Sequence, residues 1–320
     1  MPTKAFPSPA AVHDGEADIL ARVIANLADY DAKLVYADWL DDRGDPRGPL
    51  LRDFVQAFRA GKELPSTKKV PEAWGELVGL KLMGLIAEAG LSHKADQLLA
   101  LALPAIEYKK AGAGKGPVGA SRIGGRPDLP PEAEWPEYEG EPLGFLAQIN
   151  FAELHASPVA RELPAGGVLS LFCLRDEERP LNGFGPGTYR ALYAPAGTKV
   201  KPRDYPDDLA PDARPEVARV RFSEALTLPD FKGSSALKAL LKSKKDQAKY
   251  ENVNFNMLGD DHLLGHPALL NRPSSKGARH LITLGDLDGW TDDDVMYFLI
   301  SEADLKRARF DRVKMLLRQF

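Results

Sequence analysis

The residues best suited to bind a ligand lie in one stretch of the chain, residues 121–174. This stretch combines a guanidinium group, an indole ring and two carboxamides with a Gly-Gly turn. Glycine adopts backbone conformations that other residues resist, so the turn can bring amides close to a ligand or to another strand. The candidate residues for a ligand or partner site are Arg122, Gly124, Gly125, Trp135, Gln148 and Asn150. Glycine and proline in such numbers also fit a purely structural turn and sheet joint, and this alternative stays open.

No catalytic arrangement is recognisable in the sequence, and we predict no catalytic residues. Residues 111–119 contain a Gly-Lys pair that invites comparison with a phosphate-binding loop. However, Lys109 stands where such a loop needs its first glycine, and Gly116 stands where it needs Ser or Thr. Cys173 alternates with apolar residues and has no local polar partner, which predicts a buried and unreactive thiol.

We also predict no metal and no cofactor. His262 and His266 are four residues apart, but the glycine and proline on either side of His266 oppose a continuous helix that could present both rings to a metal. The acidic residues of 286–294 lack the spacing of an EF-hand loop and suit a solvated hairpin turn. The lysines of residues 232–249 are expected on the solvated face of a helix that buries its leucines.

The composition is that of a globular protein. The 320 residues are 44% hydrophobic and 28% charged, and this length suffices for two domains. A formal net charge of −4 argues against a dedicated nucleic-acid-binding protein. The N-terminus lacks the apolar run of a signal peptide, no stretch is long and apolar enough for a membrane span, and a single cysteine excludes an internal disulfide. We therefore expect a cytoplasmic protein that binds neither nucleic acid nor a membrane.

The hydrophobic pattern divides the chain into a helical first part and a strand-rich second part. Helical periodicity recurs at residues 16–30, 31–43, 49–59, 71–86 and 94–103. Asp31 is the expected N-cap of the second helix. Later apolar runs predict strands at residues 146–151, 168–173, 281–286 and 295–300. The last two runs resemble the first two, which suggests an internally duplicated strand pair and a largely antiparallel sheet.

The central stretch resembles a known bacterial domain family. S-R-I-G-G-x-P-x-L-P at residues 121–130, W-P at 135–136, F-L-A-Q-I-N at 145–150 and L-P-x-x-G-x-L-S-L-F at 163–172 are similar to the YwqG-like family of unknown function. The likeness extends over about residues 98–320. Near its end this chain has His266 and a Leu-Leu pair where the family implies G-Y-P followed by Ile-Gln, and L-I-T-L-G-D where the family implies a Gln within the strand. These departures fall where a shared ligand site is expected, and the resemblance supplies no activity.

A second resemblance covers the N-terminus. The string KLVYADWLDDRGDPRGPLLRDFVQ at residues 33–56 is similar to the repeat-companion domain, a short helical module often found ahead of leucine-rich repeats in bacteria. The likeness covers about residues 15–60. The module has no established activity, so this resemblance also implies a fold without implying a function.

We therefore predict an α+β protein with an all-helical N-terminal part followed by a mainly antiparallel β domain with a few helices. The expected divisions are a helical repeat-companion-like module at 1–62, a linker and helices at 63–104, and a YwqG-like domain at 105–320.

For function, the missing catalytic motifs favour a non-enzymatic binding or protein-interaction module, whose partner is an unknown protein or small molecule. The alternative is an enzyme or small-ligand-binding protein of unrecognised type with a pocket near the Gly-Gly turn. Such a pocket would need to join Arg122, Trp135 and Gln148 with His266 or His280. Whether these side chains converge on a cavity or pack together as core distinguishes the two readings.

Overall fold

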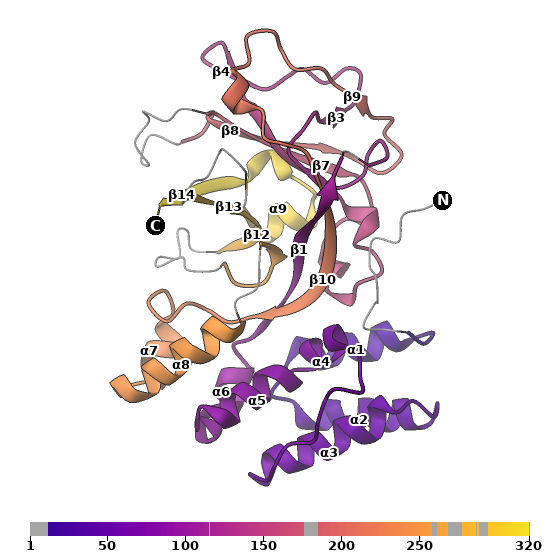
Figure 1. Ribbon diagram of the computed structural model, residues 1–320, viewed down its shortest axis with the longest axis vertical. Coiled ribbons are helices and arrows are strands. Elements are labelled where there is room, and N and C mark those ends of the chain that lie inside the picture. Colours follow the sequence, from indigo (N-terminus) through magenta and orange to yellow (C-terminus); the bar gives the residue numbers. More distant parts are fainter. Residues whose placement is uncertain are drawn as a thin grey trace.

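The computed structural model describes residues 12–114, 116–175, 185–257, 261–267, 277–285, 287 and 294–319. It confirms the predicted α+β class, because helices form the N-terminal part and an antiparallel sheet dominates the rest. Figure 1 shows the N-terminal helices gathered at one end of an elongated molecule and the strands filling the other. Within the described residues, no helix combines the length and apolar character needed to cross a membrane.

The N-terminal helices follow the predicted pattern with several differences, the first being that the helix predicted at 16–30 already ends at Ala25. The helices are α1 (Glu16–Ala25), α2 (Tyr30–Asp41), α3 (Arg47–Arg59), α4 (Glu72–Leu77), α5 (Leu80–Glu88) and α6 (Ala95–Leu99). The N-cap of α2 is Asp29, not Asp31, since the Asp29 carboxylate accepts a hydrogen bond from the Ala32 amide. The helix predicted at 71–86 is broken at Gly79, whose φ of 86° is left-handed. The helix predicted at 94–103 ends at Leu99, because Leu103 already begins a strand.

A buried polar network joins these helices. Arg47 pairs with Glu16 at 2.8 Å, and the Tyr36 hydroxyl donates to the same carboxylate. The Trp74 indole N–H donates to the Tyr36 oxygen at 3.0 Å. Burial alone would raise the pKa of Glu16, but the hydrogen bonds from Arg47 and Tyr36 outweigh it and lower that pKa. The repeat-companion-like motif therefore shares its buried polar groups with α4 beyond the segment at 62–70.

Ten strands form one sheet in which all neighbours are antiparallel. In chain order they are β1 (Leu103–Ala113), β2 (Arg122–Ile123), β6 (Gly144–Asn150), β7 (Val168–Cys173), β8 (Tyr189–Ala194), β10 (Ala218–Thr227), β11 (His262–Leu264), β12 (Ala278–Leu284), β13 (Asp294–Ser301) and β14 (Lys314–Gln319). Two-stranded sheets in the described part of the chain pair β3 (Asp128–Leu129) with β9 (Lys201–Pro202) and β4 (Glu137–Tyr138) with β5 (Glu141–Pro142).

The strand order is symmetric about the central β1–β10 pair. On one side β10 is followed by β2, β6, β7 and β8, and on the other β1 is followed by β11, β12, β13 and β14. The strand pairs β6–β7 and β12–β13 occupy equivalent places, and the first strand of each pair carries a register shift. This arrangement is the one that an internally duplicated strand pair would produce.

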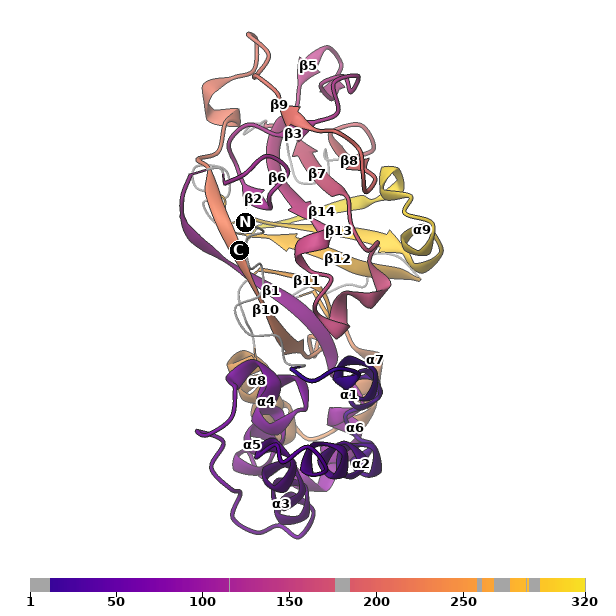
Figure 2. The same cartoon turned by 90° about the vertical axis from the view of Figure 1, so that its right-hand side faces the viewer.

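The sheet bends so that its two halves face each other, as Figure 2 shows for β6 and β7 against β12, β13 and β14. Aromatic rings fill the space between the halves. Tyr193 of β8 lies 4.9 Å, between ring centroids, from Phe310, and Tyr189 lies 6.5 Å from Phe298 of β13. Phe310 belongs to the short 3-10 helix η6 (Phe310–Arg312) that precedes β14.

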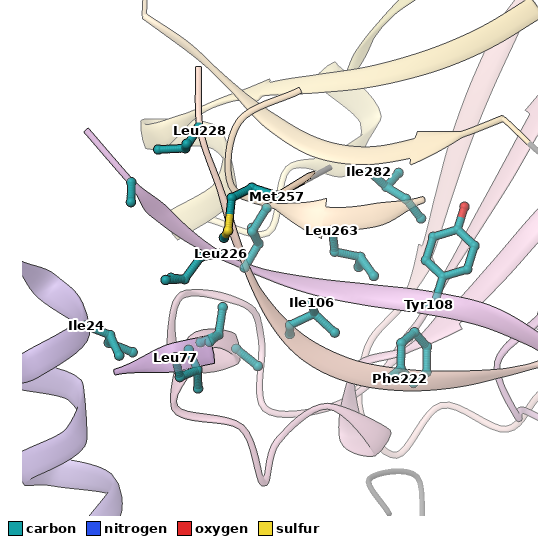
Figure 3. Close-up of a cluster of buried hydrophobic side chains, with 14 of the residues drawn as sticks. Ile24, Leu77, Ile106, Tyr108, Phe222, Leu226, Leu228, Met257, Leu263 and Ile282 are labelled. Atoms are coloured by element: carbon teal, nitrogen blue, oxygen red, sulfur yellow. The ribbon is translucent and has the colours of Figure 1, made fainter. Parts of the chain in front are cut away.

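The apolar core continues from the sheet into the helices. Figure 3 shows Ile106, Phe222 and Leu226 of the central strands in one cluster with Leu77 of α4 and Ile24 of α1. The helices α7 (Ser235–Leu240) and α8 (Lys244–Met257) lie in the chain between β10 and β11, and α8 packs beside α5. The last helix, α9 (Glu302–Lys306), follows β13.

Cys173 lies in β7 between the two halves of the sheet, 1% exposed, with its sulfur 3.6 Å from that of Met315. This confirms the predicted buried thiol, and burial raises its pKa to about 12. We expect a thiol reagent at pH 8 to label the native protein at least about 100-fold more slowly than the urea-unfolded protein, because the thiolate is suppressed and enclosed. Equal rates would show that the two halves of the sheet separate readily.

Candidate functional site

Two of the predicted site residues, Arg122 and Gln148, form a buried polar cluster with Asp128, which we call the Arg122 cluster. Arg122 lies opposite Gln148 in the β2–β6 register, which places both side chains on one face. The Arg122 guanidinium pairs with the Asp128 carboxylate at 2.8 Å. The Gln148 amide nitrogen donates to that carboxylate at 3.1 Å, and its oxygen accepts from the Asp128 backbone amide at 2.8 Å.

The Arg122 cluster is closed by backbone groups from both sides. The Asp128 carboxylate accepts from the Gly119 amide at 2.7 Å, and Gln148 donates to the Ala120 carbonyl at 2.7 Å. Arg122 also donates to the carbonyl of Arg126. Burial would raise the pKa of Asp128, but the hydrogen bonds from Arg122 and Gly119 lower it, so the carboxylate stays ionised. All three side chains therefore use their polar groups chiefly within the protein.

Asn150 has a similar structural role at the end of β6. Its amide nitrogen donates to the Gly119 carbonyl at 2.9 Å, and its oxygen accepts from the Ala152 amide at 3.0 Å. Its backbone amide donates to the Ser121 hydroxyl at 2.8 Å. Asn150 and Gln148 thus hold the segment around Gly119 from two neighbouring points on the same strand.

The Gly-Gly turn lies close to another segment of the protein, which is one of the two roles that the sequence suggested for it. Gly124 and Gly125 have φ values of 61° and 69°, which are left-handed. The Gly125 amide donates to the Pro215 carbonyl at 2.9 Å, and the Gly124 amide donates to the Leu146 carbonyl at 2.7 Å. A Cβ at Gly125 would lie 2.7 Å from that of Val217, so the turn packs directly against the segment that enters β10.

Trp135 is half-buried and anchored. Its indole N–H donates to the Leu143 carbonyl at 2.9 Å, and its ring packs edge-on against Phe172 and Tyr205, with centroids 5.5 Å and 6.1 Å away. Arg203 holds the loop before it, since one guanidinium nitrogen donates to the carbonyls of Pro130, Pro131 and Ala133.

Two arginines join Trp135 and Tyr205 at the surface. The Arg214 guanidinium lies 5.1 Å from the Tyr205 ring centroid, and that of Arg126 lies 5.9 Å from it. Arg126 is 57% exposed and pairs with the 86% exposed Asp204 at 2.6 Å. We call the group Arg126, Trp135, Tyr205 and Arg214 the aromatic–arginine surface. Of these four residues, the sequence analysis predicted Trp135 as a site residue and did not predict the other three.

The histidines considered for the alternative pocket lie elsewhere. His280 belongs to β12, on the opposite side of the central strand pair from Arg122. Both its ring nitrogens have partners, the Leu264 carbonyl and the Thr283 hydroxyl, each at 2.7 Å. His266 bonds to the Leu101 carbonyl at 2.8 Å. Burial lowers the pKa of both rings, so they are neutral near pH 7. The structure does not bring these rings to Arg122.

The remaining candidates from the sequence are a lysine-rich segment, an acidic turn and a metal site. Three of the lysines in α7 and α8 are exposed and Lys249 is partly buried, while Leu237 and Leu241 are buried, as predicted. The acidic turn at 286–294 falls almost wholly outside the described residues. In the part of the chain that is described, no three His, Cys, Asp or Glu side chains are grouped to hold a metal ion.

A protein-family model matches the larger, C-terminal part of the chain. The model, described as "Domain of unknown function (DUF1963)", matches residues 121–318. The chain belongs to this family. The DUF1963 region begins at Ser121, directly before the Arg122 cluster, and contains all six predicted site residues. Strand β1 precedes it, although β1 pairs with β10 and β11 in the centre of the sheet. A comparison with curated proteins gives no match.

The Gly-Gly turn can be tested against a glycine of the same conformation. Gly124→Ala should cost about 3 to 5 kcal/mol, because the left-handed φ is strained for alanine and the new Cβ would overlap the Glu216 carbonyl oxygen. Gly61 has the same φ of 61° with no atom near the Cβ position, so Gly61→Ala should cost only about 1 to 2 kcal/mol. Urea unfolding of both variants measures the difference. Equal losses would show that Gly124 is needed for its φ alone.

Substitution of Trp135 distinguishes a structural anchor from a free binding surface. As an anchor, Trp135→Ala should lower the free energy of unfolding by about 3 kcal/mol, the lower end of the range for a core aromatic, because the ring is half-buried. Trp135→Phe keeps the ring contacts and should lose about 1 kcal/mol for the bond to Leu143. An alanine variant that melts within a degree or two of the wild type would contradict the anchor role.

Proposed function

We propose that this DUF1963 protein is a non-enzymatic binding module and that a partner protein docks on the aromatic–arginine surface. The observation that carries the proposal is the gathering of Trp135 and Tyr205 with Arg126 and Arg214 in one partly exposed place. Tryptophan, tyrosine and arginine are the residue types that dominate the binding energy of protein interfaces.

The character of the Arg122 cluster also supports this proposal. Its side chains bond chiefly to one another and to backbone groups, which suits a rigid support better than a reaction centre. It fixes Arg126 directly, because Arg122 donates to the Arg126 carbonyl. A surface held in place in this way loses little conformational freedom on binding.

The charges favour an acidic partner. The Arg126 guanidinium pairs with the exposed Asp204, and an exposed ion pair of this kind contributes about 0 to 1 kcal/mol. A carboxylate from a partner can therefore replace Asp204 at small cost. An apolar side chain beside it would cover the exposed edges of Trp135 and Tyr205.

The proposal can be tested by crosslinking and then by affinity. A photo-crosslinking residue in place of Asp204 should capture a partner, whereas one in place of Glu302, an exposed carboxylate on α9, should not. With the captured protein purified, Arg126→Ala and Tyr205→Ala should each weaken binding about tenfold, the loss expected of an interface hot spot. Lys306→Ala is the control and should bind as wild type. Wild-type affinity in both surface variants would overturn the proposal.

The organisation of the chain belongs to the same proposal. We propose that residues 1–62 are a repeat-companion module, that 63–104 connect it to a YwqG-like domain at 105–320, and that the protein works in the cytoplasm. The motif W-L-D-D-R-G-D-P-R-G supports the first point, since its Arg47 makes the buried pair with Glu16. Limited proteolysis should cut first within the largely exposed segment at 62–70.

A further inference from the structure

A second site lies away from the aromatic–arginine surface, where the helices meet the sheet. A cavity of about 400 Å³ opens between α4, α5 and α8 on one side and β1 and β10 on the other. Junctions of this kind are frequent ligand sites, and the volume is near the lower end of the usual range of about 300 to 1,000 Å³. It therefore suits a small ligand.

Both walls of the cavity carry an ion pair, and Glu72 and Glu224 also belong to the lining. On the helical wall Lys81 of α5 lies 2.7 Å from the Glu76 carboxylate of α4. On the strand wall Lys109 lies 3.6 Å from the Glu107 carboxylate, two residues earlier on the same face of β1. The carboxylates are the more enclosed partners, with 17% and 14% exposure, whereas the lysines are 45% and 61% exposed. Carboxylates thus lie deeper and ammonium groups nearer the solvent.

The apolar lining lies beside these pairs. Leu226 of β10 and Met257 of α8 both line the cavity and are nearly fully buried. Figure 3 shows the two side chains next to each other, where the core of the sheet meets the helices. An aliphatic group that entered the cavity would therefore meet apolar surface as well as charge.

We propose that this cavity binds a small zwitterion of the α-amino acid or dipeptide class. A zwitterion can enter an existing ion pair without leaving either partner uncompensated, because its ammonium binds the carboxylate and its carboxylate binds the lysine. A purely anionic ligand has no group for the carboxylates, which are the more enclosed partners, and a purely cationic ligand has no group for the lysines. The exposed lysines move at low cost, since an exposed ion pair is weak. The apolar lining accepts an aliphatic side chain.

This site is independent of the proposed protein partner, because it uses none of the residues of the aromatic–arginine surface. This site could not be predicted from the sequence, since Glu76 and Lys81 come from one part of the chain and Glu107 and Lys109 from another. The break at Gly79 ends α4 and begins α5, which places Lys81 beside Glu76.

Titration calorimetry with the full chain tests the proposal. The probes are leucine and glycyl-leucine, compared with leucinamide, which lacks the carboxylate, and N-acetyl-leucine, which lacks the ammonium. At least one zwitterion should bind saturably with a Kd below about 1 mM, and the two blocked probes should bind at least tenfold more weakly. Absence of saturable binding for both zwitterions would overturn the proposal, as would equal binding of a blocked probe.

Variants locate the binding. Glu107→Gln and Lys109→Met each remove one half of the strand-wall pair at a partly exposed position, so the chain should fold, and each should weaken zwitterion binding at least fivefold. Glu302→Gln and Lys306→Met remove the halves of an exposed ion pair on α9 and are the matched controls. Near-ultraviolet circular dichroism checks that every variant is folded. A loss of equal size in the controls, or none in the cavity variants, would show that the probes bind elsewhere.

Discussion

The pairing of Arg122 with Asp128 holds the sheet together at its narrowest point. Strand β2 has only two residues, yet it is the strand that joins β10 to β6 and so attaches one half of the sheet to the centre. Two residues form few backbone hydrogen bonds with the neighbouring strands. The Arg122 side chain adds to them, because it pairs with the Asp128 carboxylate, which also accepts a hydrogen bond from Gln148 of β6. Breaking a buried ion pair by removing one partner typically costs about 3 to 5 kcal/mol.

The Arg122 cluster also explains why a promising set of binding residues faces inward. An arginine, two carboxamides and a Gly-Gly turn are equally the means by which a fold fastens a short strand to its neighbours. What reaches the surface is the aromatic–arginine surface, positioned by the same cluster through Arg126. The Arg122 cluster and the aromatic–arginine surface therefore form one connected structural unit.

The sequence predicted those site residues and secondary-structure elements that depend on local sequence patterns. Gln148 and Asn150 were recognisable because both lie in one strand with a clear apolar pattern, and the two classes of secondary structure followed from periodicity. Asp128 and Tyr205 were missed because their roles depend on register and on a contact across about 70 residues. The break at Gly79 was hidden, since apolar residues continue at helical spacing on both sides of it and only the left-handed φ interrupts the helix.

The central claim is that Arg122 and Asp128 act as a structural pair, and a double-mutant cycle tests it most directly. The free energies of unfolding of the wild type, Arg122→Met, Asp128→Asn and the double variant are measured in urea at pH 7. A buried pair predicts a coupling of at least about 2 kcal/mol, because each single variant leaves one buried charge without its partner whereas the double variant carries neither charge. Losses that add to within about 0.5 kcal/mol would contradict the account.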